Sequence, residues 1–225
     1  MRLPPADFRR GVGDVAPVLV GNVPFALIAG AAAVQEGISA AAAVGFSAFV
    51  FAGASQLAAI DLLARDAPLA IVVLTAAVIN VRMVMYSASL APHFGHLPTR
   101  VRALCAYLLT DPAYALSLSA FREHDADRLW YYLGAAVPIW VVWMVGTTVG
   151  ALVGRGIPES WGLTFAVPLV FLGLLAPTLR DRPSLLAGAV AGAVATLAAG
   201  VPLNLGLLVG AVAGIAAGVV GEGRL

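Results

Sequence analysis

The sequence predicts an all-α polytopic membrane protein with about eight transmembrane spans. Of its 225 residues, 61% are hydrophobic and 11% are charged, which differs strongly from the composition of a soluble domain. Apolar windows of about 17 to 25 residues, the length that crosses a hydrocarbon core, follow one another along the chain. The formal net charge is +1 and no run of basic residues occurs, so nucleic-acid binding is excluded and the lipid bilayer is the expected environment.

The apolar windows divide the chain into four parts. They cover residues 15–34, 38–63, 68–90, 101–120, 129–153, 161–179, 184–199 and 201–220. We expect a cytoplasmic N-terminal segment at 1–14, a first three-helix repeat at 15–92, a second at 101–179 and two C-terminal helices at 184–220. Only residues 200–204 separate the last two windows, so a re-entrant turn is the alternative to two full spans there.

The placement of arginines predicts how the chain is oriented in a bacterial inner membrane. If the N-terminus is cytoplasmic, nine arginines fall in cytoplasmic loops, and Arg100, Arg102 and Arg155 fall outside. This asymmetry fits the positive-inside rule and predicts that both termini are cytoplasmic. The loop with Arg100 and Arg102 is the weakest part of the assignment.

Short similarities suggest an internal repeat. Residues 24–27 resemble 112–116, and 90–92 resemble 175–177, so that the two pairs of segments have nearly the same separation along the chain. A unit with an odd number of spans places its second copy upside down in the membrane. The sequence therefore predicts a three-plus-three inverted repeat, an architecture typical of secondary transporters.

Two prolines fall at corresponding places in this repeat. Asn22 precedes Pro24, and Thr110 and Asp111 precede Pro112. Proline removes a backbone donor and leaves a carbonyl free one turn earlier, and this carbonyl needs a partner inside a membrane. We predict helix breaks at Pro24 and Pro112 beside a binding site. The alternative is a simple kink whose backbone is satisfied by neighbouring helices.

Arg82 is the strongest functional signal, because it lies in the middle of an apolar window between Asn80 and Tyr86. A guanidinium stays charged, so at this depth it needs an anion, a water-filled cavity or a substrate. Asp111, the only acid well inside a span, is the candidate partner. Two alternatives remain: a permanent ion pair that holds two helices, or a pair with which a substrate carboxylate or a proton competes.

Residues 51–56 combine small and hydrogen-bonding side chains at mid-depth. Gly53 permits close approach, and Ser55 and Gln56 can bind a polar head group, although plain helix packing explains them equally well. The full predicted substrate site is Asn22, Gly53, Ser55, Gln56, Asn80, Arg82 and Tyr86, with Asp111 as ion pair or proton carrier and Phe25, Phe51 and Met85 as apolar wall.

Other chemistry is disfavoured. Cys105 is the only cysteine, and His93 and His96 lack further metal ligands nearby, so no metal and no cofactor are expected. No catalytic motif is recognised, and we expect that the chain is not an enzyme. Glycines at every fourth position, Gly206, Gly210, Gly214 and Gly218, predict close packing within the chain or, alternatively, against a partner helix.

These strings together resemble the AzlC-type branched-chain amino acid permeases, a family that includes the large subunit of bacterial valine exporters. The family patterns Phe-Ala-Gly-Ala-x-Gln and Asn-x-Arg-x-x-x-Tyr fall on residues 51–56 and on Asn80, Arg82 and Tyr86. The similarity extends from about residue 8 to 177. Ala26 stands where relatives often have glycine, which puts a close backbone contact there in doubt.

The resemblance implies export of valine, leucine and isoleucine, with methionine or toxic analogues as further candidates, and a small AzlD-type membrane subunit as obligatory partner. The residues alone indicate a small secondary transporter of a polar or zwitterionic solute, with coupling to the proton gradient through Asp111. Two other classes remain open. They are a membrane scaffold that moves nothing and a channel for small polar solutes.

Overall fold

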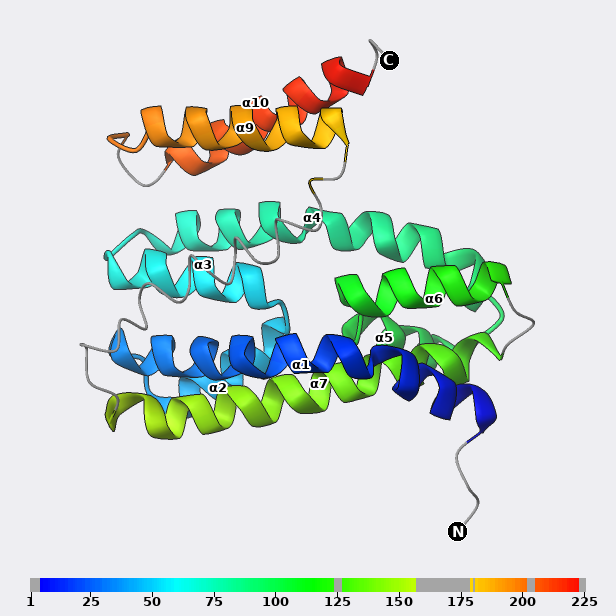
Figure 1. The fold of residues 1–225 in the computed structure, drawn as a ribbon. Helices are drawn as coiled ribbons and strands as arrows, with labels where there is room; N and C mark the ends of the chain where they lie inside the picture. Colours follow the sequence, from blue (N-terminus) through cyan, green and yellow to red (C-terminus); the bar gives the residue numbers. More distant parts are fainter. Residues whose placement is uncertain (1–4, 124–126, 157–178, 180, 202–204, 223–225) are drawn as a thin grey trace.

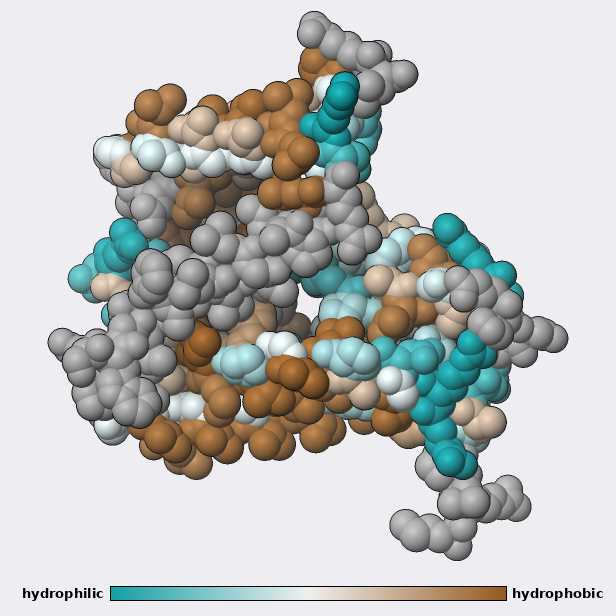
Figure 2. Space-filling view, viewed as in Figure 1, coloured by the Kyte–Doolittle hydropathy of each residue, from teal (hydrophilic) through white to brown (hydrophobic). Residues whose placement is uncertain are grey.

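The computed structural model describes residues 5–123, 127–156, 179, 181–201 and 205–222, and in this part the chain is helical throughout its regular structure. Three of the described helices are long and apolar enough to cross a membrane: α1 (Ala6–Gln35), α4 (Leu69–Phe94) and α7 (Arg128–Val153). They lie roughly parallel to one another, with two hairpins of shorter helices between them (Figure 1). Apolar side chains cover the middle of α7, and hydrophilic ones gather at the end of the molecule where α1 begins (Figure 2).

The helices α1 and α7 run in the same direction and pack through small residues (Figure 1). A Cβ atom at Gly11 would overlap the backbone of Tyr131, and one at Gly30 would overlap the backbone of Thr147. Gly150 of α7 meets the backbone of α1 at Leu27 in the same way. Glycine at these positions lets the two backbones touch, as small residues do in membrane helix pairs. This pair is the base on which the hairpins pack.

The predicted helix break at Pro24 is wrong. Helix α1 runs without interruption through both Pro17 and Pro24. A proline inside a helix removes one backbone hydrogen bond. Close backbone contacts with α7 at Gly11 and Gly30, on either side of the two prolines, keep α1 helical despite that loss.

Residues 38–63, expected as one span, form a hairpin of two helices, α2 (Ala40–Val50) and α3 (Gly53–Ala64). The Ser47 hydroxyl lies 2.7 Å from Nε2 of Gln56. Nine residues of continuous helix would separate the two along the axis by about 13.5 Å. The chain therefore turns back between them, at Phe51, which has left-handed backbone geometry with φ 40°. Both ends of the hairpin lie at the end of the molecule where α1 ends (Figure 1).

Residues 101–120, also expected as one span, belong to a second hairpin made of α5 (Thr99–Tyr107) and α6 (Asp111–Glu123). The chain leaves helical geometry at residues 108–110, directly before Pro112, where the sequence predicts a break. Phe121 near the end of α6 packs against Phe94 at the end of α4, with ring centres 6.1 Å apart. This hairpin therefore begins and ends at the end of the molecule opposite to the one where α2 and α3 enter (Figure 1).

A long helix followed by a hairpin thus occurs twice, in opposite directions. The two units have the same spacing along the chain. The ends of the long helices, Gln35 of α1 and Phe94 of α4, are separated by the same number of residues as the starts of the hairpins, Ala40 of α2 and Thr99 of α5. This helix–hairpin unit differs from the predicted unit of three spans. The three-plus-three repeat stays a prediction, because much of its second copy, 101–179, lies in residues 157–178, outside the described part.

Helices α9 (Arg182–Leu197) and α10 (Leu205–Glu222) form a separate antiparallel pair (Figure 1). The glycines of α10 face alanines of α9: Gly210 meets Ala191 and Ala195, and Gly214 meets Ala191. The glycine face of α10 therefore packs within the chain, as the sequence predicts. The predicted span at 161–179 lies almost wholly outside the described residues.

The side of the membrane from which each hairpin enters can be tested by cysteine labelling. We expect cysteines placed at Glu36 and Arg65 to react with a membrane-impermeant maleimide from one side, and cysteines at His96 and Arg122 to react from the other side. Each pair flanks one hairpin, and buried Cys105 is replaced by serine in all variants. Single spans in place of the hairpins would put the two members of each pair on opposite sides.

Candidate functional site

The centre of the site is an ion pair between α4 and the start of α6. Nη1 of Arg82 lies 3.0 Å from Oδ1 of Asp111, and the hydroxyl of Tyr86 donates to the same oxygen at 2.9 Å. Asp111 is in the first turn of α6, where the helix dipole also favours a negative charge. The side chains of Arg82 and Asp111 are 37% and 42% exposed, so the pair is only half-buried between the helices.

Stacked tyrosines hold α6 against α4. The rings of Tyr86 and Tyr114 are 4.2 Å apart and nearly parallel, and the hydroxyl of Tyr114 lies 3.2 Å from that of Ser89. Sequence reasoning missed Tyr114 and Ser89. The available signal was spacing, because Tyr86 and Ser89 are three residues apart on one helical face.

The opposite face of α4 is bonded to α3. Nδ2 of Asn80 donates to the hydroxyl of Ser55 at 2.9 Å, and this hydroxyl donates to the carbonyl of Ala52 at 3.0 Å. Asn80 and Arg82 are two residues apart on a helix and therefore point in different directions. Helix α4 thus contacts the α2–α3 hairpin through Asn80 and the α5–α6 hairpin through Arg82.

Gln56 has a structural partner. It is fully buried, and the hydroxyl of Ser47 lies 2.7 Å from its Nε2 and 3.1 Å from its Oε1. This contact ties α2 to α3 just below the turn of the hairpin. It corresponds to the packing alternative for Gln56, and Ser47 was not recognised from the sequence.

The tips of the two hairpins meet between the long helices. The hydroxyl of Tyr107, the last residue of α5, donates to the carbonyl of Ala48 at 2.6 Å. Its ring lies 6.0 Å from that of Phe51, and Nε1 of Trp140 donates to its hydroxyl at 2.9 Å. The helix breaks of the two hairpins therefore lie close together. Tyr107 and Trp140 were not singled out from the sequence.

Several buried polar atoms have no hydrogen-bond partner among the described residues. They include Nδ2 of Asn22, Oδ1 of Asn80, Nε of Arg82, Oγ1 of Thr110 and Nε1 of Trp143. Buried polar groups are nearly always paired in folded proteins, and unpaired ones need water or a ligand.

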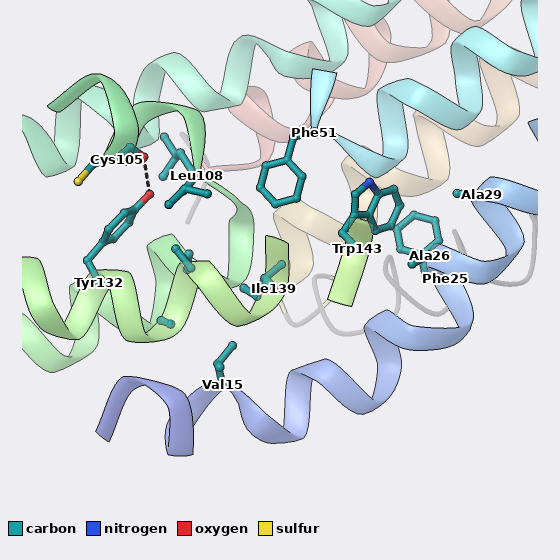
Figure 3. Close-up of a cluster of buried hydrophobic side chains, with 14 of the residues drawn as sticks. Val15, Phe25, Ala26, Ala29, Phe51, Cys105, Leu108, Tyr132, Ile139 and Trp143 are labelled. Carbon is teal, nitrogen blue, oxygen red and sulfur yellow. Dashed lines mark hydrogen bonds between the residues drawn. The ribbon is translucent and has the colours of Figure 1, made fainter. Parts of the chain in front are cut away.

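The remaining predicted residues take different positions. Phe25 and Phe51 are buried, and Gly53 lies against the rings of Phe25 and Trp143 (Figure 3). Met85 is 63% exposed on α4. Phe25 and Phe51 therefore lie beside the α3 helix start, as apolar wall residues would, and Met85 is an exposed residue of α4.

The long apolar helices and the buried polar cluster between them define a helical membrane protein. The family model described as AzlC protein matches residues 17–157, and the chain belongs to this family. It is 31% identical to the inner membrane protein YgaZ of Escherichia coli (strain K12) over 83% of this chain and 81% of that protein. It is also 31% identical to an uncharacterized membrane protein of Archaeoglobus fulgidus, over 86% and 84% of the two chains. No solved structure matches it.

Proposed function

We propose that the protein is a secondary transporter that exports branched-chain amino acids from bacterial cells. The observation that carries the proposal is the meeting of two broken helices beside the Arg82–Asp111 pair. Broken helices at mid-membrane, with polar backbone and side chains around them, form the substrate and ion sites of many secondary transporters. The family relationship supports a membrane role of this kind.

The chemistry of the site fits a zwitterion with an apolar tail. Such a solute needs a few convergent polar groups beside an apolar wall. The unpaired Oδ1 of Asn80, on the side of α4 that faces α3, supplies a polar group, and the buried rings of Phe25 and Phe51 supply apolar surface. Valine, leucine and isoleucine have this composition, and methionine is a further candidate.

Asp111 is the proposed carrier of the coupling proton. Its Oδ1 accepts from Arg82 and from Tyr86, and its side chain is 42% exposed. Protonation of Asp111 would cancel its attraction to Arg82. A proton could thereby exchange with the ion pair during each transport cycle, which would couple export to the proton gradient.

The hairpins strengthen the proposed orientation with a cytoplasmic N-terminus. Because α5 and α6 return to the end at which they enter, Arg100 and Arg102 belong to the same end as the start of α1. That end also holds Arg9, Arg10, Arg122 and Arg128. Arg65 and Arg155 follow α3 and α7 at the other end. Six of these eight arginines lie at the end where α1 starts, whereas the assignment from single spans puts five of the same eight inside, so the hairpins fit the positive-inside rule better.

An efflux experiment tests this function together with the proposed partner, a small AzlD-type subunit. Cells that overproduce both chains and receive a valine-containing dipeptide should hold less internal valine and resist a toxic valine analogue. The chain alone should have a weaker effect. Equal internal pools with and without the pair would favour the scaffold alternative. In vesicles, saturable counterflow would distinguish a carrier from a channel.

A further inference from the structure

The start of α3 is a half-buried helix N-terminus without a side-chain cap. Ala52 stands at the cap position, where it forms no side-chain hydrogen bond, and α3 continues for 12 residues from Gly53. Ala52, Gly53 and Ala54 are half-buried, and the neighbouring Phe51 and Ser55 are buried. The first backbone N–H groups of a helix have no acceptor within the helix, and buried ones need another partner.

A tryptophan of α7 directs an unpaired donor toward this helix start. Trp143 is 4% exposed, and its Nε1 has no hydrogen-bond partner among the described residues. The Cη2 atom of its ring lies 2.7 Å from the position that a Cβ atom of Gly53 would occupy, and the ring of Phe25 closes the other side at 2.9 Å. In Figure 3 the indole nitrogen is turned toward the first turn of α3. The N–H of Trp143 and the free N–H groups of α3 are all donors.

The other hairpin shows which kind of group suits such a position. Asp111 begins α6 just as Gly53 begins α3, at a corresponding place in the second helix–hairpin unit. The start of α6 therefore carries a carboxylate of its own, which Arg82 and Tyr86 contact. The start of α3 has the same dipole but carries no side chain there. The start of α3 therefore offers hydrogen-bond donors and has no anion of its own, as carboxylate-binding sites at helix N-termini do.

We propose that the start of α3 binds the carboxylate of the transported amino acid, and that Nε1 of Trp143 donates a hydrogen bond to it. This assignment rests on the proposed function. It gives Arg82 and Asp111 the coupling role and moves substrate recognition to the other hairpin. Asn80, whose Nδ2 is held by Ser55 in the same turn of α3, presents its unpaired Oδ1 to the ammonium group.

Binding of labelled leucine to the chain with its partner in detergent tests the site. Trp143→Phe keeps a six-membered aromatic ring but removes the N–H donor together with part of the ring system. It should weaken leucine binding about tenfold or more, as expected for a hydrogen bond to a charged group. Trp130→Phe is the matched control, because Trp130 is 40% exposed in the first turn of α7, far along the helix from Trp143. The control should bind leucine as the wild type does.

Ligands that lack one charge distinguish recognition from a general packing defect. The wild type should bind leucine and 4-methylpentanoate, which both carry a carboxylate, and discriminate against leucinamide. Trp143→Phe should lose most of that discrimination, whatever its stability. In wild-type protein with ¹⁵N-labelled indoles, leucine should shift the Trp143 N–H signal and leucinamide should not.

The outcomes separate the two proposals. If Trp143→Phe binds leucine like the wild type and the indole signal does not move, the carboxylate site is wrong and the exporter function stands. If the wild type does not bind valine, leucine or isoleucine but binds other carboxylates through Trp143, the carboxylate site is correct and the proposed substrate class is wrong. Failure of the wild type to bind any carboxylate overturns the site as well.

Discussion

Replacing Arg82 by alanine should abolish amino acid efflux. The substitution leaves Asp111 without its cation at the start of α6 and removes the only ion pair that the described residues form between α4 and the second hairpin. An uncompensated carboxylate in the membrane either takes up a proton permanently or opens the site to water. In both cases the cycle of proton exchange stops. The measurement is efflux of valine from vesicles that contain equal amounts of each variant.

Lysine at position 82 should not restore transport. Arg82 uses Nη1 for Asp111 and has a second donor, Nε, buried without a partner among the described residues, and a lysine ammonium cannot reproduce this geometry. Arg65→Ala is the control, because Arg65 forms an exposed pair with Asp61 at the end of α3 and should have little effect. Efflux by Arg82→Ala at the wild-type rate would exclude both the coupling role and the substrate role of Arg82.

Gly30→Ala should destabilise the whole protein. A Cβ atom at Gly30 would overlap the carbonyl of Thr147 and come within 2.7 Å of the backbone nitrogen of Ala151. Backbone atoms cannot rotate away as a flexible side chain can, so α1 and α7 would have to separate. Overpacking of this kind costs about 1–3 kcal/mol or more. Thermal unfolding in detergent should show a lower midpoint and a lower yield of monodisperse protein.

Gly21→Ala in the same helix is the matched control. Nothing lies within 4 Å of a Cβ atom at Gly21 among the described residues, and alanine is the better helix former. The unfolding midpoint of this variant should stay the same or rise. If Gly30→Ala and Gly21→Ala had equal midpoints, the close packing of α1 on α7 would be incorrect.

The sequence predicts the chemistry of the site better than its geometry. The pairing of Arg82 with Asp111 follows from two charges in apolar segments, because burial forces opposite charges together. The two hairpins could not be predicted in this way, since the apolar windows 38–63 and 101–120 are each long enough for a span. The turn of the first hairpin falls on Phe51, whose left-handed backbone is unusual for an aromatic residue and gives no local signal.

Proline was a misleading signal in one helix. Pro24 and Pro112 look alike in the sequence, but α1 is supported by α7 along its length, whereas Pro112 stands in the first turn of α6, where its missing N–H costs nothing. Trp143 could not be recognised at all. Its importance depends on the contact with Gly53, which is far away in the chain, and only the folded structure brings them together.

The position of α4 has a consequence for how the site can open. Asn80 ties α4 to a hairpin that enters from one end of the molecule, and Arg82 ties it to a hairpin that enters from the other. A rotation of α4 that loosens one of these contacts moves the other at the same time. We therefore expect the two entrances to be alternatives, since one helix controls both and a single movement cannot leave them open together.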